Sequence, residues 1–438
     1  MFQRKLLAIL ALLGVIAACD QQQVPTDAPQ VPTDAPVAGA APTNVAPSAT
    51  TAPTSAPPTE PTSAPTLPAT TTPTTAPATG SGKPGRNVPT VIVPPAAPIQ
   101  LPAGFGISVF QSGLGGPRMM TVGPDGAVYV AERGAGRIVR LPDRNADGVS
   151  DGVEVIADNL DAPSSIAFFQ DNSLYVAETT RVLRLSDPDR RGVFAARATV
   201  IDGLPDGGHN TRTVLWSADW RKLYVSIGSS CNVCNEDDER RATIMVYNPD
   251  GSGGEVYAKG LRNAVGLALH PGSNEIWATN NGRDQLGDDV PPETVNAITT
   301  AGLDFGWPRC HAGDIVDPDF GGERGCAEVT APAVAMQAHS APLGLSFGER
   351  TTFPAPFQNG LFVAFHGSWN RSEPTGYKVV FIPLNDGTAG APQDFAMGWL
   401  KANGDVWGRP VDVLSGTDGS LYVSDDAGGT IYRIFAVQ

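Results

Sequence analysis

The sequence predicts an all-β protein, a six-bladed β-propeller that follows a lipoprotein signal peptide and a disordered Pro/Thr-rich stalk. One strand-turn-strand pattern recurs six times between residues 100 and 438, and no segment shows a long apolar period of 3.6 residues. Each copy has an apolar strand, a turn and a Leu-Tyr-Val-like strand that leads to a small or acidic residue. The copies are 117–141, 162–185, 212–230, 262–282, 357–371 and 409–434. Six such units around one axis form a propeller, whereas an eight-stranded barrel or a sandwich would leave the repeat unexplained.

The turns and the C-terminal segment support this architecture. Pro124-Asp125-Gly126 and Asp418-Gly419 supply the backbone freedom that a hairpin needs. The chain ends in the strand-like run TIYRIFAV (430–437), which can complete the blade begun near residue 105. We therefore expect the two ends of the propeller domain, 100–438, to close the ring.

Residues 1–19 predict export and a lipid anchor. Arg4 and Lys5 precede an apolar run, and IAAC (16–19) fits a lipobox in which Cys19 becomes the lipidated N-terminus. The alternative is an ordinary signal peptide with a chance cysteine. No second apolar run approaches the roughly 20 residues that span a bilayer. We therefore expect an extracytoplasmic protein that is anchored to the bacterial cell membrane only by its lipid.

Residues 20–99 have the composition of a disordered stalk. Pro, Thr, Ala and Ser dominate, and such a stretch cannot bury enough apolar surface to offset its ordering entropy. Residues 1–99 hold four basic and four acidic residues, so the formal net charge of −15 lies on the folded part. An acidic surface argues against nucleic acid as a partner and suits calcium or neutral ligands.

The four cysteines other than Cys19 predict two disulfides, as expected of an exported protein. We pair Cys231 with Cys234 and Cys310 with Cys326. The competing hypothesis is a four-cysteine zinc site. The sequence contains one C-x-x-C motif and no second one, which argues against such a site.

Arginine and histidine recur at one phase of the repeat, just before the inner strand. These positions are Pro117-Arg118, His209 with Arg212, Arg262-Asn263 and Arg409-Pro410. A single arginine there could lock a blade through a salt bridge. Four equivalent positions around one axis predict a site for a polyanion, because packing cations together without an anion is costly.

With these residues in place, the chain resembles the glucose/sorbosone dehydrogenase family, quinoproteins that use pyrroloquinoline quinone (PQQ). It is most similar to the sorbosone and pyranose dehydrogenase branch. The stretches that carry the resemblance are LPDGGHNTRT, GSSCNVCNEDDERRA, GLRNAVGLAL, NNGRDQLGDDVPPETVN, GLDFGWP, HGSWNRS and GRPVDV. They extend from about residue 103 to the C-terminus and are specific only in combination.

The resemblance implies a set of cofactor-binding residues. PQQ carries three carboxylates and an ortho-quinone, so Arg118, Arg262 and Arg409 would clamp carboxylates in bidentate fashion. Asn263 and His366 would add hydrogen bonds. The glucose branch has a cofactor-binding lysine where this chain has HGSWNR, so His366 or Arg371 would have to replace it.

The resemblance also implies calcium. The carbonyl groups of Gly282 and Arg283 would hold the ion beside the quinone, and loop oxygens suit its coordination. Asp288, Asp289 and Glu293 would form a second, structural calcium site, in a motif that is stretched relative to the glucose branch.

A further loop, DRNADGVSDGVE (143–154), has the ligand spacing of an EF-hand loop without its helices. The residues at ligand spacing are Asp143, Asn145, Asp147, Asp151 and Glu154, with Gly148 at the turn. Because strand-like segments flank it, we predict a calcium loop within a β-hairpin. The alternative is a polar Asp-Gly turn that needs no ion.

The resemblance assigns catalysis to the turn DGGHNTRT. His209 would act as general base on the anomeric hydroxyl while hydride moves to the quinone, a role that suits a neutral imidazole. Arg212 would stabilise the reduced quinone or bind a carboxylate. The alternative is that His209 is a solvated turn residue without a catalytic role. We expect His270 to be a solvated loop residue, and His311 and His339 to shape the substrate mouth.

Together these features predict a PQQ- and calcium-dependent dehydrogenase that oxidises an aldose or a sorbosone-like sugar. The chain has no C-x-x-C-H haem motif, so electrons would pass to an external acceptor. Two alternatives stay open: a non-catalytic lipid-anchored propeller that binds glycans or a protein, and a calcium-dependent lactonase. A lactonase needs no ring of arginines, and a degenerate binder would be expected to lose His209 and the Arg262-Asn263 pair.

Overall fold

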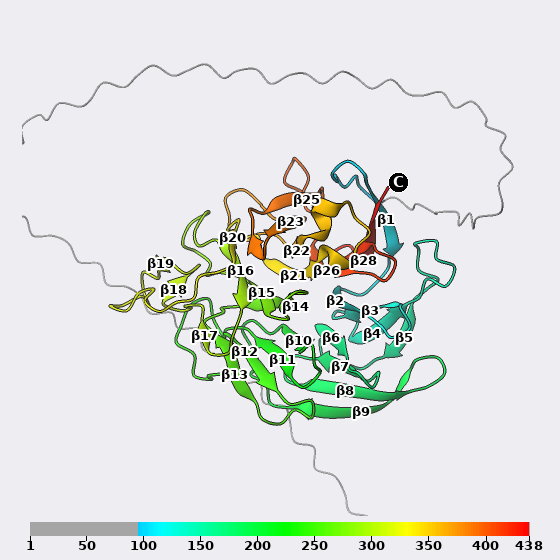
Figure 1. Ribbon diagram of the computed structural model, residues 1–438, viewed down its shortest axis with the longest axis horizontal. Coiled ribbons are helices and arrows are strands. Elements are labelled where there is room, and N and C mark those ends of the chain that lie inside the picture. Colours follow the sequence, from blue (N-terminus) through cyan, green and yellow to red (C-terminus); the bar gives the residue numbers. More distant parts are fainter. Residues whose placement is uncertain (1–94, 438) are drawn as a thin grey trace, which may run out of the picture. The chain divides into compact units, whose positions relative to one another are not determined.

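The computed structural model describes residues 95–437, which form six antiparallel blades around one axis (Figure 1). The innermost strands contact one another around the ring; they are β2 (Pro117–Val122), β6 (Ser165–Phe168), β10 (Arg212–Trp216), β14 (Ala264–Leu269), β21 (Pro342–Phe347) and β26 (Pro410–Ser415). The second strands are β3 (Val128–Glu132), β7 (Leu174–Ala177), β11 (Leu223–Ile227), β15 (Ile276–Asn280), β22 (Gly360–Phe365) and β27 (Leu421–Asp425).

The outer half of each blade holds two more strands. The third strands are β4 (Arg137–Leu141), β8 (Val182–Pro188), β12 (Thr243–Tyr247), β16 (Glu293–Ile298), β23 (Lys378–Asn385) and β28 (Thr430–Ala436). The outermost strands are β5 (Glu154–Ala157), β9 (Phe194–Ile201), β13 (Glu255–Lys259), β20 (Val334–Met336), β25 (Gln393–Met397) and β1 (Phe105–Gln111). The predicted six-bladed propeller is thus confirmed.

Ring closure follows the predicted route. The first strand, β1, pairs antiparallel with the last, β28, with Phe105 opposite Ala436 and Val109 opposite Tyr432. The sixth blade therefore takes its outer strand from the start of the domain and its other three from the end. Ordered packing begins at Ile99, which lies against the core between the fifth and sixth blades. The predicted signal peptide, Cys19 and the stalk up to residue 94 lie outside the described residues.

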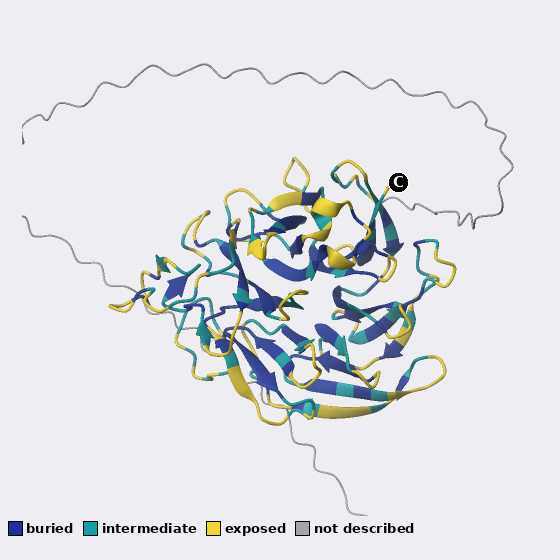
Figure 2. Cartoon of the chain, viewed as in Figure 1, coloured by how far each residue is buried: buried dark blue, intermediate teal, exposed yellow. Residues whose placement is uncertain are grey.

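The core consists of apolar layers between neighbouring blades. Six clusters of buried side chains each combine residues of two adjacent blades, for example Tyr129 and Ile138 of the first with Leu174 of the second. Exposed positions gather in the loops and on outer strands such as β9 and β13 (Figure 2). This pattern explains why the Leu-Tyr-Val strands, which have apolar neighbours on both sides, carry the clearest repeat.

The acidic residue that ends several Leu-Tyr-Val strands has a structural role. The carboxylates of Glu132, Glu178 and Asp425 are buried. They accept hydrogen bonds from the backbone N–H groups of Gly115, Asp161 and Arg409, respectively, just ahead of an inner strand. Each carboxylate therefore fixes the approach to its own blade, which accounts for its recurrence in the sequence.

Shorter elements lie outside the four-stranded pattern. They are β17 (Leu303–Asp304), β18 (Cys310–His311), β19 (Ile315–Val316), β24 (Thr388–Ala389), the 3-10 helix η1 (Gly348–Arg350) and α1 (Ala355–Gln358). β17 adds a parallel strand to β13 of the third blade, and β18 and β19 form a small sheet of their own. Both predicted disulfides are present, Cys231–Cys234 and Cys310–Cys326. All four cysteines are used in this way, so the zinc alternative is not realised.

The axis of the propeller is closed by an apolar layer. Met119, Val265, Leu343 and Val411, from four inner strands, pack together. Further along the inner strands, a cavity of about 360 Å³ is lined by residues of all six. The layer therefore separates the ends of the inner strands at which the arginines lie from the rest of the channel.

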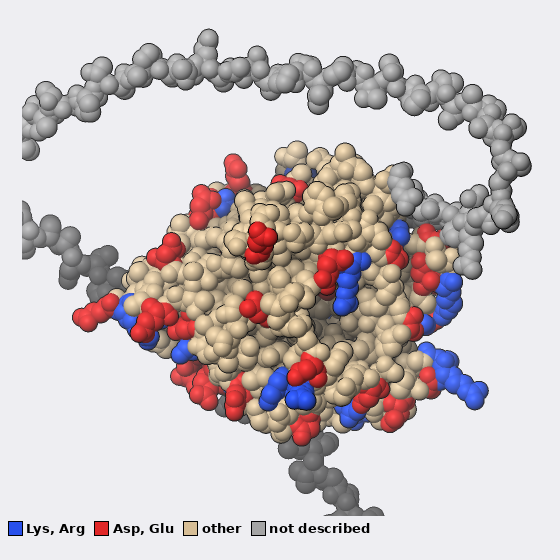
Figure 3. Space-filling view, in the orientation of Figure 1, with Lys and Arg blue, Asp and Glu red and all other residues tan. Residues whose placement is uncertain are grey.

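Charge on the visible face fits the acidic composition. Acidic side chains are spread over this face and its rim, with Lys and Arg among them (Figure 3). No helix among residues 95–437 is long and apolar enough to cross a membrane.

Candidate active site

The predicted site residues gather at one end of the propeller. Arg118, His209, Arg212, Arg262 and Arg409 stand within three residues of the start of an inner strand. Because the second strand of each blade is antiparallel to the first, the loops that follow the second strands lie at this same end. Those loops contribute Ser229, Asn232, Asp284, His366 and Asp426.

Two glycines allow His209 to approach the axis. Gly208 has φ +58°, and a Cβ on it would lie 2.5 Å from the Cα and carbonyl oxygen of Ser230. A Cβ on Gly228 would lie 2.5 Å from the Cβ of His209 and 2.7 Å from Oδ1 of Asn263. Neither position has room for a larger residue, so the glycines bring His209 and Asn263 together.

The hydrogen bonds of His209 fix its tautomer. Its Nδ1 lies 3.1 Å from the carbonyl oxygen of Ser229 and 2.9 Å from Ser229 Oγ. The Ser229 hydroxyl proton is already donated to the carbonyl of Cys231, at 2.7 Å. Since both atoms facing Nδ1 act as acceptors, Nδ1 carries the proton and Nε2 keeps its lone pair.

The environment keeps His209 neutral. Burial, together with the charges of Arg262, Arg241 and Arg212, lowers the pKa of His209 to about 4. At neutral pH the imidazole is therefore uncharged, and its Nε2 can accept a proton.

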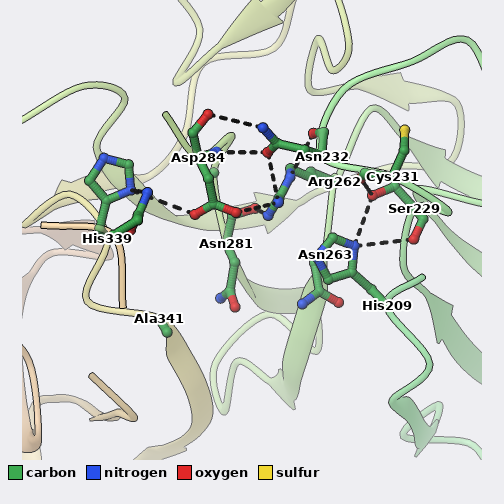
Figure 4. A network of polar contacts seen from close by, with 12 residues as sticks. His209, Ser229, Cys231, Asn232, Arg262, Asn263, Asn281, Asp284, His339 and Ala341 are labelled. Atoms are coloured by element: carbon green, nitrogen blue, oxygen red, sulfur yellow. Dashed lines mark hydrogen bonds and ion pairs between the residues drawn. The ribbon is translucent and has the colours of Figure 1, made fainter. Parts of the chain in front are cut away.

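Arg262 is held by the loops after β11 and β15 (Figure 4). Its Nη2 donates to Asp284 Oδ2 at 2.8 Å and to Asn232 Oδ1 at 3.0 Å, and its Nε donates to the Asn232 carbonyl at 2.9 Å. Burial lowers the pKa of Arg262, but Asp284 opposes this shift. The guanidinium is thus a buried, fixed cation close to His209.

A second cluster forms around Asp426. Its carboxylate accepts hydrogen bonds from Arg118 Nη1 and Arg409 Nε at 3.0 Å each, and lies 3.1 Å from His366 Nε2. Burial alone would raise the pKa of Asp426, but the contact with His366 and the charges of Arg118 and Arg409 hold it at about 2. The predicted cofactor-binding residues Arg118, His366 and Arg409 are therefore brought together on one carboxylate.

Three further arginines add charge without a counter-ion. Arg212 donates to the carbonyls of His209, Thr211 and Pro205, and Arg241 to those of Asp206, Gly207 and Gly228. Arg133 bonds the Ala162 carbonyl and Asn210 Oδ1. Within residues 95–437 none of these three has an ion-pair partner.

This crowding leaves the site short of negative charge. Burial and the charge of Arg241 lower the pKa of Arg212 to about 10, and burial with Arg133 and Arg409 lowers that of Arg118 against the opposing effect of Asp426. Nε of Arg118, Nε of Arg212 and Oδ1 of Asn263 are buried without a hydrogen-bond partner among the described residues. Buried polar atoms of this kind are normally satisfied. The unpartnered guanidinium donors fit an anionic ligand, whereas Asn263 Oδ1 is an acceptor and fits a hydrogen-bond donor.

The calcium ligands implied by the resemblance have mixed outcomes. In the described part of the chain, no hydrogen bond reaches the carbonyl oxygens of Gly282 and Arg283. The Arg283 guanidinium is bound to Asp317 and Asp319. Two free loop carbonyls fit a cation that prefers oxygen ligands.

The second calcium site is not formed as expected. Asp288 accepts from the Ser372 N–H, Asp289 pairs with Arg371 at 3.0 Å, and buried Glu293 accepts from the N–H groups of Gly282 and Ala341. The three carboxylates do not converge, because Glu293 is the first residue of β16 and faces inward. Arg371, expected at the cofactor, instead binds this loop through Asp289 and the Asp288 carbonyl.

The loop 143–154 has the hydrogen bonds of a tight acidic turn. Asp143 accepts from the N–H groups of Asp147 and Gly148, Asn145 accepts from Asp147, and Asp151 accepts from Arg144. Glu154 departs from the expected ligand set, because its two oxygens bind Arg140 and Arg144 on the wall of a cavity of about 810 Å³. Calcium binding by the remaining residues stays a prediction.

Each of the three remaining histidines contacts neighbouring residues. His311 is buried, with Nε2 2.7 Å from Asp317. His339, also buried, lies 2.8 Å from the Gly287 carbonyl through Nε2, and Asn370 contacts its Nδ1. His270 packs against the rings of Trp277 and Phe347. His270 is half-exposed in a turn, in keeping with a loop residue. A role of His311 and His339 in shaping the substrate mouth stays a prediction.

Sequence reasoning missed the residues that pair with the arginines, and it missed two further arginines of the site. Asp426, Asp284, Asn232, Arg133 and Arg241 all lie in loops that follow second strands or precede third strands. All five stand within four residues of the end of a Leu-Tyr-Val-like strand or in a quoted motif, and alignment of the repeats at that phase could have found them.

Comparison with known proteins assigns the family. The model of the family described as TrAA12-like matches residues 99–314 and 316–436. The chain belongs to the TrAA12-like family. An uncharacterized protein of Borreliella burgdorferi is 30% identical over 352 residues, which cover 77% of this chain and 90% of that protein.

Two fungal relatives have assigned activities. A pyrroloquinoline quinone-dependent pyranose dehydrogenase of Coprinopsis cinerea is 26% identical over 399 residues, covering 76% of this chain and 54% of that protein. The match thus spans about half the length of that relative. A pyrroloquinoline quinone-dependent sugar dehydrogenase of Hypocrea jecorina is 25% identical, covering 75% of this chain and 87% of that protein.

A solved structure agrees on the fold. The holo form of the pyranose dehydrogenase PQQ domain from Coprinopsis cinerea superposes with a TM-score of 0.69 at 23% identity, covering 79% of this chain and 98% of that chain. The resemblance to PQQ-dependent sugar dehydrogenases that the sequence motifs indicated is confirmed.

Proposed function

We propose that this TrAA12-like protein oxidises a sugar at a carbinol carbon, with PQQ as hydride acceptor, calcium as its partner ion and His209 as general base. The observation that carries the proposal is a histidine, His209, whose Nε2 has no hydrogen-bond partner among the described residues and on which the charges of Arg212, Arg241 and Arg262 act. Arg118 and Arg409 lie at the same end of the propeller. The activities named for the two fungal relatives support it.

Arg118, Arg262 and Arg409 would hold the carboxylates of PQQ, with His366 and Asn263 beside them. Their guanidinium groups are already fixed by Asp426 and Asp284, so binding would require little side-chain ordering. When bound, the quinone supplies the electron sink for the hydride. Arg212 is fully buried and donates to the carbonyl of His209, so it would hold the His209 turn and act on the quinone only through its charge.

His209 would take the proton of the sugar hydroxyl at Nε2. The Ser229 contacts orient the ring and keep the proton of the neutral form on Nδ1, so the proton received goes to Nε2. The imidazolium that results would lie among three arginines, which disfavours its persistence and returns the proton to solvent after oxidation.

The carbonyl oxygens of Gly282 and Arg283 would contribute ligands to calcium at this site. The ion pairs of Arg283 with Asp317 and Asp319 keep its guanidinium on those two carboxylates. A sorbosone-like or pyranose substrate and an external electron acceptor belong to the same proposal.

We further propose lipid anchoring outside the cytoplasm through Cys19. Two disulfides favour an oxidising compartment. Metabolic labelling with a fatty acid should mark the wild type and leave Cys19→Ser unlabelled, and equal labelling of the two would contradict the anchor.

The decisive experiment is reconstitution. Metal-free protein is titrated with PQQ in calcium and in chelator, and absorbance and melting temperature are followed. Saturable binding, a calcium-dependent rise in melting temperature and reduction of a dye by pyranoses would support the proposal. A wild type that binds no PQQ in either condition would refute it.

A further inference from the structure

The loop closed by the Cys231–Cys234 disulfide carries Asn232, which lies beside Arg262 (Figure 4). It follows β11, and only Asn232 and Val233 separate the two cysteines. The loop is fixed at a further point, because the N–H and hydroxyl of Ser230 both donate to Glu236. Asn232 is therefore presented from a short, doubly closed turn.

Asn232 forms hydrogen bonds with the Arg262 guanidinium and with the backbone of Asp284. Its Oδ1 accepts from Arg262 Nη2 at 3.0 Å and from the Asp284 N–H at 2.8 Å, and its Nδ2 donates to the Asp284 carbonyl at 3.0 Å. Its own carbonyl accepts from Arg262 Nε at 2.9 Å. Nε and Nη2 of Arg262 are thereby both held by this one residue.

The same loop also reaches His209. The Cys231 carbonyl accepts the Ser229 hydroxyl, which leaves Ser229 Oγ as an acceptor for Nδ1 of His209. The Ser229 N–H in turn donates to the Arg262 carbonyl at 2.8 Å. One turn thus contacts both the base and the buried arginine.

We propose that Asn232 is a positioning residue for the cofactor's carboxylate, held in place by the Cys231–Cys234 bridge, and that the bridge sets cofactor affinity rather than global stability. This inference rests on the proposed function. Asn232 fixes the direction of Arg262 through uncharged acceptors, beside the carboxylate of Asp284 that already pairs with it. A second carboxylate at position 232 would add negative charge that competes with an anionic ligand.

The short loop that this bridge closes supports a local role for it. The stabilisation that a disulfide gives through loop closure grows with the logarithm of the loop length. The Cys231–Cys234 bridge has a sequence separation of 3 and the Cys310–Cys326 bridge one of 16. Loss of the first should therefore affect the site more than the fold, and loss of the second the reverse.

The test compares matched variants of the full chain by PQQ titration in calcium, melting temperature of the apo-protein and kcat at saturating PQQ. Asn232→Ala and Asn232→Asp should each weaken PQQ binding about 10- to 100-fold, the range typical of residues that orient a ligand-binding group. Asn232→Asp retains acceptors for Arg262, so it should fold and keep a kcat near that of the wild type once PQQ saturates. Val233→Ala, in the same turn, should bind PQQ like the wild type.

The two bridges provide the second comparison. Cys231→Ser/Cys234→Ser should weaken PQQ binding by a similar factor with little change in melting temperature, and Cys310→Ser/Cys326→Ser should lower the melting temperature while leaving PQQ affinity unchanged. Equal affinity of the wild type and the Asn232 variants would overturn the inference, as would a fall in affinity shared by Val233→Ala. A wild type that binds no PQQ would instead overturn the proposed function, and the inference with it.

Discussion

Replacing His209 with glutamine separates its role as a base from its role in the fold. Glutamine can keep a hydrogen bond to Ser229 but cannot take a proton, so PQQ affinity should stay within a few-fold of the wild type. The rate of sugar oxidation should fall by about 10² to 10⁴, or roughly 3 to 5.5 kcal/mol in the barrier.

The structure also predicts where the pH dependence lies. Burial and the charges of Arg262, Arg241 and Arg212 lower the pKa of His209 from 6.5 to about 4, a difference of roughly 3 kcal/mol against protonation. A bound ligand with three carboxylates adds negative charge and offsets part of this shift. In the holoenzyme, kcat/KM should therefore rise with pH through a value between about 4 and 6.5 and be level above it.

The assay is the reductive half-reaction followed at single turnover from pH 4 to 8. His270→Gln, a packed loop histidine away from the arginines, is the matched control and should keep the wild-type profile. The glutamine variant at position 209 should lack the acidic limb altogether. A variant that retains both the wild-type rate and the limb would refute the assignment of the base.

Three more predictions test the charges and the acidic loop. Burial raises the pKa of Asp412 to about 7, so the folded state keeps a proton that the unfolded state loses, and stability should fall by about 4 kcal/mol as pH rises from 4 to 7. Asp412→Asn should abolish that slope in urea unfolding, and parallel slopes would contradict it. Asp426→Asn should lower apo-protein stability by about 3 to 5 kcal/mol, because it leaves buried cations unpaired. Saturating PQQ should restore part of this loss in a thermal shift assay, and an equal loss with and without PQQ would count against an anionic ligand. Asp147→Ala should lower the melting temperature more in calcium than in chelator, whereas equal losses would show that loop 143–154 is only a turn.

The repeat made the fold and half of the site predictable from the sequence. Arg118, Arg262 and Arg409 occupy the same phase of different blades, and equivalent positions of a propeller must lie at the same end. Their partners Asp284 and Asp426 were not predicted, although each lies after the second strand of the blade that carries Arg262 or Arg409. Only the pair of Arg118 with Asp426 joins two different blades and depends on the closed ring.

The expected second calcium site shows that residues close together in the sequence need not share a site. Asp288, Asp289 and Glu293 are neighbours in sequence, but the Pro291-Pro292 turn ends the loop and β16 starts at Glu293. The strand carries this side chain into the interior, where it accepts from Gly282 and Ala341 while the two aspartates stay outside. Sequence proximity therefore could not reveal which carboxylates share a site.

The charge of the site runs against that of the whole chain, and this contrast defines its ligands. The formal net charge is −15, yet Arg118, Arg262 and Arg409 share only two carboxylate partners and Arg133, Arg212 and Arg241 have none among the described residues. Such a concentration of unpaired cations is costly in a buried site unless a ligand neutralises it. A neutral sugar cannot do so, whereas a cofactor with several carboxylates can. In the proposed function the cofactor therefore accounts for the arginines, and Nε2 of His209 is left for the substrate.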